Sequence, residues 1–204
     1  MKSRNVIYVF LAVGISVLLY YSFQGDQTSA AYAEGILKER ADKDAFMRSA
    51  DDSPFSKKRN EFAGLKYFAP DMKFRIHANL KPVEKREVVS LVTSDANTQA
   101  YMAYAWADFD FENLHNRLLI LEVMEGAERG KLFLAFADAT SANETYGAGR
   151  YLDVKKVPGA STITLDFNNA YNPYCAYTNT YSCPFPPKEN VLKIAIRAGE
   201  MNYK

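Results

Sequence analysis

Hydrophobic and polar residues alternate with a period of two through most of the chain after Lys73. Turn-forming residues such as Gly, Asn, Asp and Pro separate the alternating runs. The runs lie at 73–80, 87–93, 100–111, 117–124, 131–138, 150–154, 162–167 and 191–197. Short, closely spaced strands with no helical pattern between them predict a mainly β fold, an antiparallel β-sandwich or barrel of about eight strands.

The strand expected around Tyr101 divides its side chains unevenly by size. Alanines occupy positions 103, 105 and 107, whereas Met102, Tyr104 and Trp106 occupy the positions between them. Successive side chains of a strand point to opposite faces of the sheet. The alternation therefore predicts that this strand fills the core with its large side.

A different pattern precedes the strands. Apolar residues are interleaved there with many charged ones, which predicts a helical arm over residues 31–63. Pro54 is expected to end a first helix and to open a second, and Gly64 to stop that one. Residues 26–33 are expected to form a short linker. The apolar positions of the arm are Ile36, Leu37, Phe46 and Met47.

The beginning of the chain has the composition of a membrane anchor. Residues 6–23 contain no charge, and as a helix they would span about 27 Å, close to the thickness of a bilayer core. The basic residues before this run predict that the N-terminus stays inside. We therefore expect a transmembrane signal-anchor at 1–25 and an extracytoplasmic domain at 34–204, in a bacterial periplasm or cell envelope. Cleavage near residues 31–33 is the alternative.

Two cysteines, Cys175 and Cys183, are the only ones in the chain. In an oxidising compartment, two cysteines this close in sequence predict a disulfide. A structural zinc site is the alternative, but it needs two more ligands, and the only histidines, His77 and His115, are far away in sequence. A reactive thiol is disfavoured, because no base neighbours either cysteine in the sequence.

Charge excludes one class of partner. Residues 1–25 hold two basic residues and no acidic one, so without them the 25 basic residues fall to 23 against 24 acidic ones. A nearly neutral domain lacks the basic surface that binding to nucleic acid requires, so no nucleic-acid partner is expected. The 14 tyrosines and 13 phenylalanines agree with a β-rich fold.

Polar residues outside any regular apolar pattern gather between residues 136 and 190. Loops of this kind on a rigid scaffold often bind ligands, and the sequence predicts one pocket for a small polar ligand or a glycan. Within it, Arg150 would orient an anionic group through forked hydrogen bonds, and the amides would fix hydroxyl groups. The predicted ligand-binding residues are Glu144, Tyr146, Arg150, Tyr151, Asp166, Asn168, Tyr171 and Asn172.

A hydrolase is the alternative function. Glu144 and Asp166 are candidate catalytic residues, because two carboxylates held several ångströms apart can act as acid and base on a glycosidic bond. Their structural alternative is that each caps a turn or pairs with Arg150. No serine-hydrolase, phosphate-loop or calcium-loop pattern is present, so neither a metal nor a cofactor is expected.

The segment 171–187 is rich in rigid and aromatic residues. It contains four tyrosines, four of the eight prolines and both cysteines. Rigid tyrosines make contact surfaces at a low cost in conformational entropy, which suits a glycan, a peptide or a lipid headgroup. The alternative is a loop that plugs one end of the β scaffold with its own side chains.

Several short sequences in the same region resemble the prokaryotic family DUF1684, a domain of unknown function. The resemblance extends over about residues 34–199 and implies that the acidic, amide and tyrosine positions form one shared constellation, but it implies no reaction. The matching sequences are DDSP at 51–54, FAGL at 62–65, YFAP at 67–70, ADAT at 137–140, ETYG at 144–147, GRYLD at 149–153, DFN at 166–168, AYNP at 170–173, CAY at 175–177, CP at 183–184 and PKEN at 187–190.

Overall fold

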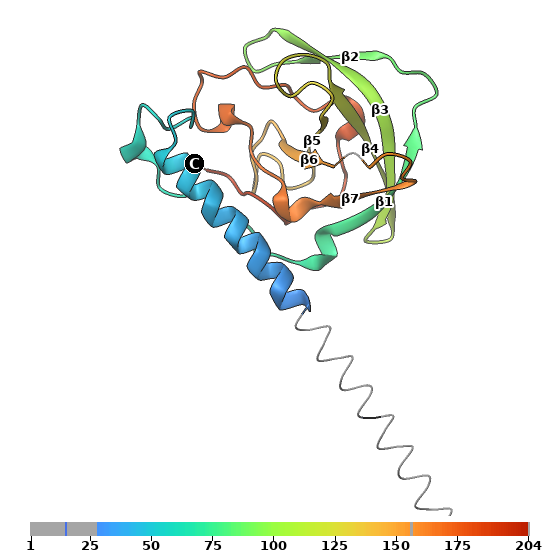
Figure 1. The fold of residues 1–204 in the computed structure, drawn as a ribbon, viewed down its shortest axis with the longest axis horizontal. Helices are drawn as coiled ribbons and strands as arrows, with labels where there is room; N and C mark the ends of the chain where they lie inside the picture. The colour runs from blue at the N-terminus through green and yellow to red at the C-terminus, as the bar shows by residue number, and fades with distance from the viewer. Residues whose placement is uncertain (1–14, 16–27, 156, 204) are drawn as a thin grey trace, which may run out of the picture.

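The computed structural model describes residue 15, residues 28–155 and residues 157–203. Within these ranges the chain forms one antiparallel sheet and one α-helix (Figure 1). The order of pairing is β6-β5-β4-β3-β1-β7, and β2 also pairs with β3. The strands are β1 (Arg75–Pro82), β2 (Val88–Val92), β3 (Thr98–Phe111), β4 (Leu114–Val123), β5 (Leu132–Phe136), β6 (Arg150–Val154) and β7 (Thr162–Asp166).

The predicted mainly β, antiparallel character is confirmed, but the predicted sandwich or closed barrel is wrong. The strands form a single sheet that curls into a half-barrel, in which β6 and β7 are the two ends of the pairing order. These two strands lie near each other without forming a ladder. The sheet curls because the 14-residue β3 pairs along its length with β1 and β2 on one side and with β4 on the other.

A β-bulge in β3 explains why the predicted core face of this strand is wrong. The pairing with β4 shifts between Ala103 and Ala105, and a bulge of this kind reverses the faces beyond it. Tyr101 therefore packs on one side of the sheet, whereas Ala107 and Phe109 pack in the main core on the other side. The alanines are buried, and the larger residues between them are only half-buried.

The main core fills the concave side of the half-barrel. Every strand except β2 contributes apolar side chains to it, and the C-terminal segment adds Leu192, Ile194 and Ile196. Its fully buried members include Leu118 and Ile120 of β4, Leu134 and Phe136 of β5, and Leu165 of β7. The period-two pattern of the sequence therefore reports the true inward face of most strands.

The segment 191–197, predicted as an eighth strand, is wrong as a strand. Its alternate side chains Leu192, Ile194 and Ile196 are buried in the main core, as the pattern suggests. Its backbone, however, pairs only locally, through bonds from Leu192 N–H to the Ala137 carbonyl and from the Ala139 N–H to the Ile194 carbonyl. The Arg150 guanidinium binds the Ile196 carbonyl, so a neighbouring strand cannot use it.

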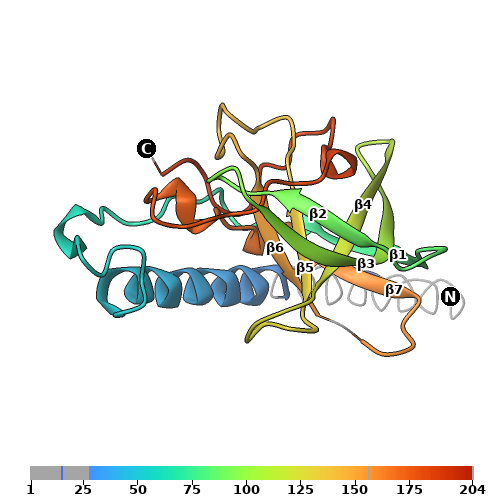
Figure 2. The ribbon, with the colours of Figure 1, turned by 90° about the horizontal axis from the view of Figure 1, so that it is seen from above.

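The helix covers residues 28–49 and lies along the open side of the half-barrel (Figure 2). Ile36, Arg40 and Met47 are its buried positions, spaced as one face of a 3.6-residue helix requires. Just after its end, the Ser53 hydroxyl donates a hydrogen bond of 2.6 Å to the Met47 carbonyl. Residues 28–33, which were predicted as part of the linker, are already helical.

Turns and short 3-10 helices replace the predicted second helix of the arm. Only η1 (Arg59–Glu61) follows Pro54 before Gly64, whose positive φ of 94° turns the chain. Phe55 and Phe62 dock on the end of the long helix instead. Further 3-10 helices are η2 (Met72–Phe74), η3 (Phe167–Asn169), η4 (Tyr174–Ala176) and η5 (Lys188–Asn190).

The predicted fold class also included a transmembrane anchor, and this part is corrected. Among residue 15 and residues 28–155 and 157–203, no helix combines the length and the apolar character needed to cross a bilayer. The proposed anchor at 1–25, with its apolar run at 6–23, lies outside the described residues apart from residue 15. The fold supported here is a half-barrel sheet with one helix.

Candidate functional site

Arg150, predicted to orient a ligand, lies instead in the centre of the molecule. It is 1% exposed and stands at the start of β6. Its Nη2 donates to Asp138 Oδ2 at 2.8 Å and to the Ile196 carbonyl at 2.8 Å, and its Nη1 donates to the carbonyls of Ala198 and Glu200. Arg150 therefore fastens the C-terminal segment to the sheet and is not available to an external anion.

Gly149 makes room for this arrangement. Its φ of 87° lies in the left-handed region, and a Cβ at this position would lie 2.6 Å from the Phe136 carbonyl oxygen and 2.6 Å from Pro186 Cγ. The glycine therefore lets the chain approach β5 closely just before Arg150 enters the core. The positive φ of Gly149 therefore has a packing role.

Asp166 and Asn168 join the helix to the end of β7. The Tyr32 hydroxyl donates to both carboxylate oxygens of Asp166, at 2.7 and 2.8 Å. The Asn168 side chain donates to the Tyr32 hydroxyl and the Asp71 carbonyl, and accepts a bond from the Asp71 N–H. Arg40 of the helix donates to the Asn168 carbonyl at 3.0 Å. The predicted amide thus binds the protein itself.

Glu144 lies in a different environment from Asp166. Both of its carboxylate oxygens accept hydrogen bonds from Arg197 at 3.0 Å, and Arg197 is 59% exposed. Asp166 lines a cavity of about 710 Å³, whereas Glu144 does not line it. The two carboxylates therefore do not face each other across this cavity, which is the arrangement that the hydrolase hypothesis needs.

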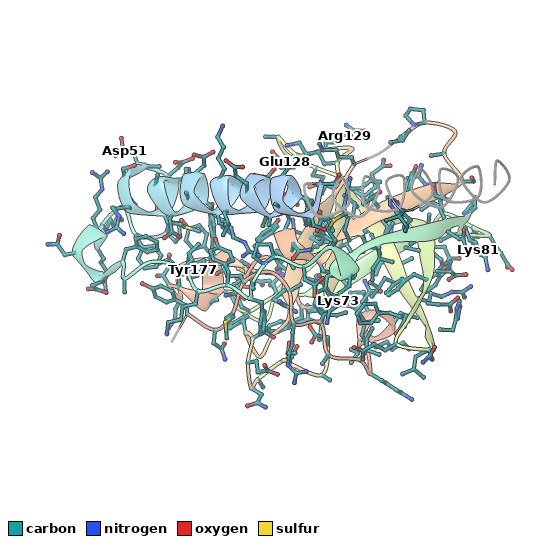
Figure 3. All side chains as sticks on the ribbon, turned by 90° about the horizontal axis from the view of Figure 1, so that it is seen from below. Asp51, Lys73, Lys81, Glu128, Arg129 and Tyr177 are labelled. Carbon is teal, nitrogen blue, oxygen red and sulfur yellow. The ribbon has the colours of Figure 1, made fainter. Side chains whose placement is uncertain are left out.

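Asn172 and Glu200 form a second buried polar centre. Glu200, which is 1% exposed, accepts a hydrogen bond from Asn172 Nδ2 at 2.9 Å, one from the Tyr177 hydroxyl and an ion pair from Lys43 at 3.0 Å. Burial, followed by the nearby Glu200 charge, raises the pKa of Tyr177. Figure 3 shows Tyr177 in the layer beside the long helix. Glu200 was not predicted as a site residue, because it lies beyond the last alternating run, which ends at residue 197.

Two of the three tyrosines predicted as ligand contacts, Tyr151 and Tyr171, line a cavity of about 570 Å³ that we call the tyrosine cavity. Tyr151 and Tyr171 exchange backbone hydrogen bonds of 2.8 and 2.9 Å. Tyr174 and Tyr181 form an edge-to-face pair with ring centroids 5.0 Å apart. The cavity is lined by Lys43, Phe133, Tyr151, Asp153, Tyr171, Pro173, Tyr174, Tyr181, Ser182, Cys183 and Pro184.

Protein contacts hold two of these rings firmly. The Tyr151 hydroxyl donates to the Pro184 carbonyl at 2.7 Å, and the Tyr171 hydroxyl donates to Asp153 Oδ1 at 2.9 Å. The Lys43 ammonium lies 4.6 Å from the centroid of the Tyr171 ring. Burial, with the Asp153 charge second, raises the pKa of Tyr171, so its hydroxyl remains a donor at neutral pH.

Tyr146 and Asn172, the remaining predicted ligand contacts, do not line the tyrosine cavity. Asn172 is fully buried beneath it, against Glu200. The Tyr146 hydroxyl lies 3.9 Å from Cys175 Sγ, so the stretch around Tyr146 does reach the aromatic segment. The sequence thus predicted the meeting of the two stretches, but buried polar contacts take up many of the groups assigned to the ligand.

The predicted disulfide is absent from the structure. Cys175 and Cys183 are both free, and the Cys175 N–H donates to Cys183 Sγ at 3.2 Å. The two residues are neighbours in space, as expected, but their sulfurs are thiols. Across the described parts of the chain, no group of three or more His, Cys, Asp or Glu side chains is arranged to hold a metal ion.

Comparison with known proteins identifies a family and a similar solved structure. The family described as "Protein of unknown function (DUF1684)" matches residues 60–201. An uncharacterised protein of Haloarcula marismortui, solved by solution NMR, is 34% identical, with a TM-score of 0.64. The match covers 86% of this chain and 97% of the archaeal one. No curated protein matches this chain.

Proposed function

Because this chain belongs to the DUF1684 family, which is described only as being of unknown function, we propose its function from the geometry of the tyrosine cavity. The protein is a binding module that receives a small polar ring, such as one saccharide unit, between the tyrosines of the segment 171–187 and Tyr151. The observation that supports this proposal is the set of four tyrosine rings around one open space of about 570 Å³.

The size and lining of the cavity suit such a ligand. Small-molecule pockets usually measure about 300–1,000 Å³ and combine aromatic walls with a few polar groups. Apolar ring faces of a sugar pack on tyrosine rings, while its hydroxyls need hydrogen-bond partners. No other side chain of the described residues binds the Tyr174 or Tyr181 hydroxyl, and Asp153 supplies a carboxylate at the rim.

The cavity is also preformed. Pro173 and Pro184 fix the backbone on either side of the aromatic pair, and the reciprocal bonds between Tyr151 and Tyr171 tie the wall to β6. A wall that is already ordered loses little conformational entropy when a ligand binds. No second carboxylate joins Asp153 in the lining, so the cavity favours binding over acid–base catalysis.

Titration of the full chain with neutral monosaccharides and disaccharides, followed by calorimetry and by thermal shift, tests the proposal. We expect binding that Tyr181→Ala weakens about tenfold, since the loss of one stacked ring costs about 0.5–1.5 kcal/mol beyond the lost contact area. Phe185→Ala is the matched control, because Phe185 is an exposed aromatic residue of the same segment that does not line the cavity.

Three outcomes would overturn the proposal. In the first, no saccharide binds at millimolar concentration to a protein that is shown to be folded. In the second, Tyr181→Ala binds as tightly as the unmodified chain. If Thr162→Val, on the wall of the larger cavity, weakens binding instead, the ligand occupies that cavity and the tyrosine site is excluded.

A further inference from the structure

Cys175 and Cys183 lie in unequal surroundings. Cys183 is buried and lies on the wall of the tyrosine cavity, whereas Cys175 is half-exposed. The Cys175 N–H donates to Cys183 Sγ at 3.2 Å, and the Cys183 N–H donates to Ser94 Oγ at 3.1 Å. The backbone of each cysteine therefore fixes the position of the pair, and Cys175 is the less buried of the two residues.

The Cys175 sulfur lies close to a hydroxyl and to the second thiol. The Tyr146 hydroxyl donates to it at 3.9 Å, the Cys175 N–H donates to Cys183 Sγ, and the nearby Ser94 hydroxyl donates to the Tyr181 carbonyl at 3.1 Å. The hydrogen bond from Cys183, followed by those from Tyr146 and Ser94, lowers the pKa of Cys175 to about 6, although burial opposes the shift. The same contact raises the pKa of Cys183. A thiolate stabilised in this way attacks disulfides, and a protonated neighbour can follow it.

We propose that Cys175 and Cys183 form a redox-active dithiol that low-molecular-weight disulfides oxidise, with Cys175 as the attacking thiol and Cys183 as the resolving thiol. The sequence disfavoured a reactive thiol because no base lies near either cysteine along the chain. In the fold, the Tyr146 hydroxyl takes the place of a base as the stabilising neighbour, because it donates a hydrogen bond to Cys175 Sγ at 3.9 Å.

The reaction has two balanced steps. The Cys175 thiolate attacks one sulfur of the small disulfide, a mixed disulfide forms, and the other half leaves as a thiolate that takes up a proton. The Cys183 thiol then loses its proton and attacks Cys175 Sγ, which breaks the mixed disulfide and releases the second small thiol. The protein dithiol is oxidised to one disulfide, and the small disulfide is reduced to two thiols.

The test uses the reduced full chain and oxidised glutathione, followed by intact-mass spectrometry and peptide mapping. We expect the unmodified chain to lose two hydrogen atoms and to retain no glutathione. Cys183→Ser should retain one glutathione on Cys175, because the resolving thiol is missing. Cys175→Ser should react at least about tenfold more slowly at neutral pH, since the buried Cys183 is then the only thiol.

A second measurement separates a reactive pair from two adjacent but inert thiols. The rate of alkylation of Cys175 by iodoacetamide in the unmodified chain should reach half its maximum near pH 6. Tyr146→Phe should move this midpoint upward and slow the reaction at neutral pH, with no effect at about pH 9, where the thiol is ionised in either case. The pH profile responds to the hydroxyl alone and does not change with a general loss of packing.

The proposal is overturned if Cys175→Ser takes up glutathione as fast as the unmodified chain does. It is also overturned if the folded, reduced protein does not react while the urea-unfolded chain does. An alkylation midpoint near pH 8.5, the value of an ordinary thiol, would likewise contradict it. None of these measurements requires a saccharide, so their outcome is independent of the function proposed above.

Discussion

The buried polar centres and the tyrosine cavity are built from the same C-terminal stretches, but they differ in what their side chains contact. Around Arg150 and Glu200, the protein itself supplies most partners of each charged group. In the cavity, the rings of Tyr174 and Tyr181 border open space. Charges and amides in irregular segments thus fasten this fold together, and the aromatic rings face the space where a ligand would bind.

We expect the largest loss of stability from a substitution in the buried polar centre around Arg150. Arg150→Met leaves the Asp138 carboxylate buried without its cation and frees three backbone carbonyls. Removal of one partner of a buried ion pair costs about 3–5 kcal/mol. Urea unfolding, followed by the fluorescence of the only tryptophan, Trp106, measures the loss.

Arg197→Met is the control for this change. The pair between Arg197 and Glu144 has similar distances but is partly exposed, so its loss should cost no more than about 1 kcal/mol. If the two variants lost equal stability, burial would not explain the larger contribution expected of the pair between Arg150 and Asp138.

The next effect concerns the backbone that brings Arg150 into the core. Gly149→Ala forces a Cβ to within 2.6 Å of the Phe136 carbonyl oxygen at a positive φ, and we expect a loss of about 2–3 kcal/mol in the free energy of unfolding. Gly126→Ala also has a positive φ, but it meets open space and should cost about 1 kcal/mol. Equal losses in urea titrations of the two variants would mean that the close approach to β5 is not needed.

A pair of tyrosines tests both regions with the same chemical change. Tyr177→Phe removes a hydroxyl that donates to the buried Glu200, and should cost about 1–2 kcal/mol. Tyr181→Phe removes a cavity hydroxyl that has no partner among the described residues, and should change stability by no more than about 0.5 kcal/mol. Thermal unfolding of the two variants shows the difference, and a larger loss for Tyr181→Phe would reverse the assignment of the two regions.

The smallest effect depends on pH. Asp108 is buried, but its partners Arg117 and Lys81 are exposed, so we expect Asp108→Asn to cost about 1 kcal/mol at pH 7. The hydrogen bond from Arg117 lowers the pKa of Asp108 to about 2, below the value of about 3.9 in an unfolded chain. The contribution is therefore present above about pH 4 and disappears as the pH falls through about 2.

Urea titrations of the unmodified chain and Asp108→Asn at several pH values check this sign. The difference between the two proteins should be constant near neutral pH and close to zero at pH 2. A difference that grows as the pH falls would contradict the depressed pKa.

The strands were predictable because their burial is one-sided. Seven of the eight predicted runs are strands, since alternation follows directly from the pleat of the sheet. The exception, 191–197, alternates for the same reason but lacks a ladder, because the Arg150 side chain binds one of its carbonyls. The bulge after Ala103 could not be seen either, because a change of pairing leaves no mark on the types of residue.

The site was predictable in part. Tyrosines and prolines concentrated in one segment indicated an aromatic surface, and three of the four tyrosines of this segment line the cavity. The roles of Arg150 and Asn172 were not predictable, because a polar residue in an irregular segment looks the same whether it binds a ligand or a buried carbonyl. Glu200 and Lys43 are far apart in the sequence, so their contact depends entirely on the tertiary fold.

The gap between β6 and β7, which form no ladder with each other, affects the tendency of the protein to aggregate. Strand edges with free backbone groups recruit other chains and seed aggregates. The helix borders the same cavity as these two strands, through Ala31, Tyr32 and Ile36. The helix therefore covers the gap between the two strand edges. If this helix were detached, the unpaired edges of β6 and β7 would be exposed to solvent. We would expect such a chain to self-associate before it unfolds.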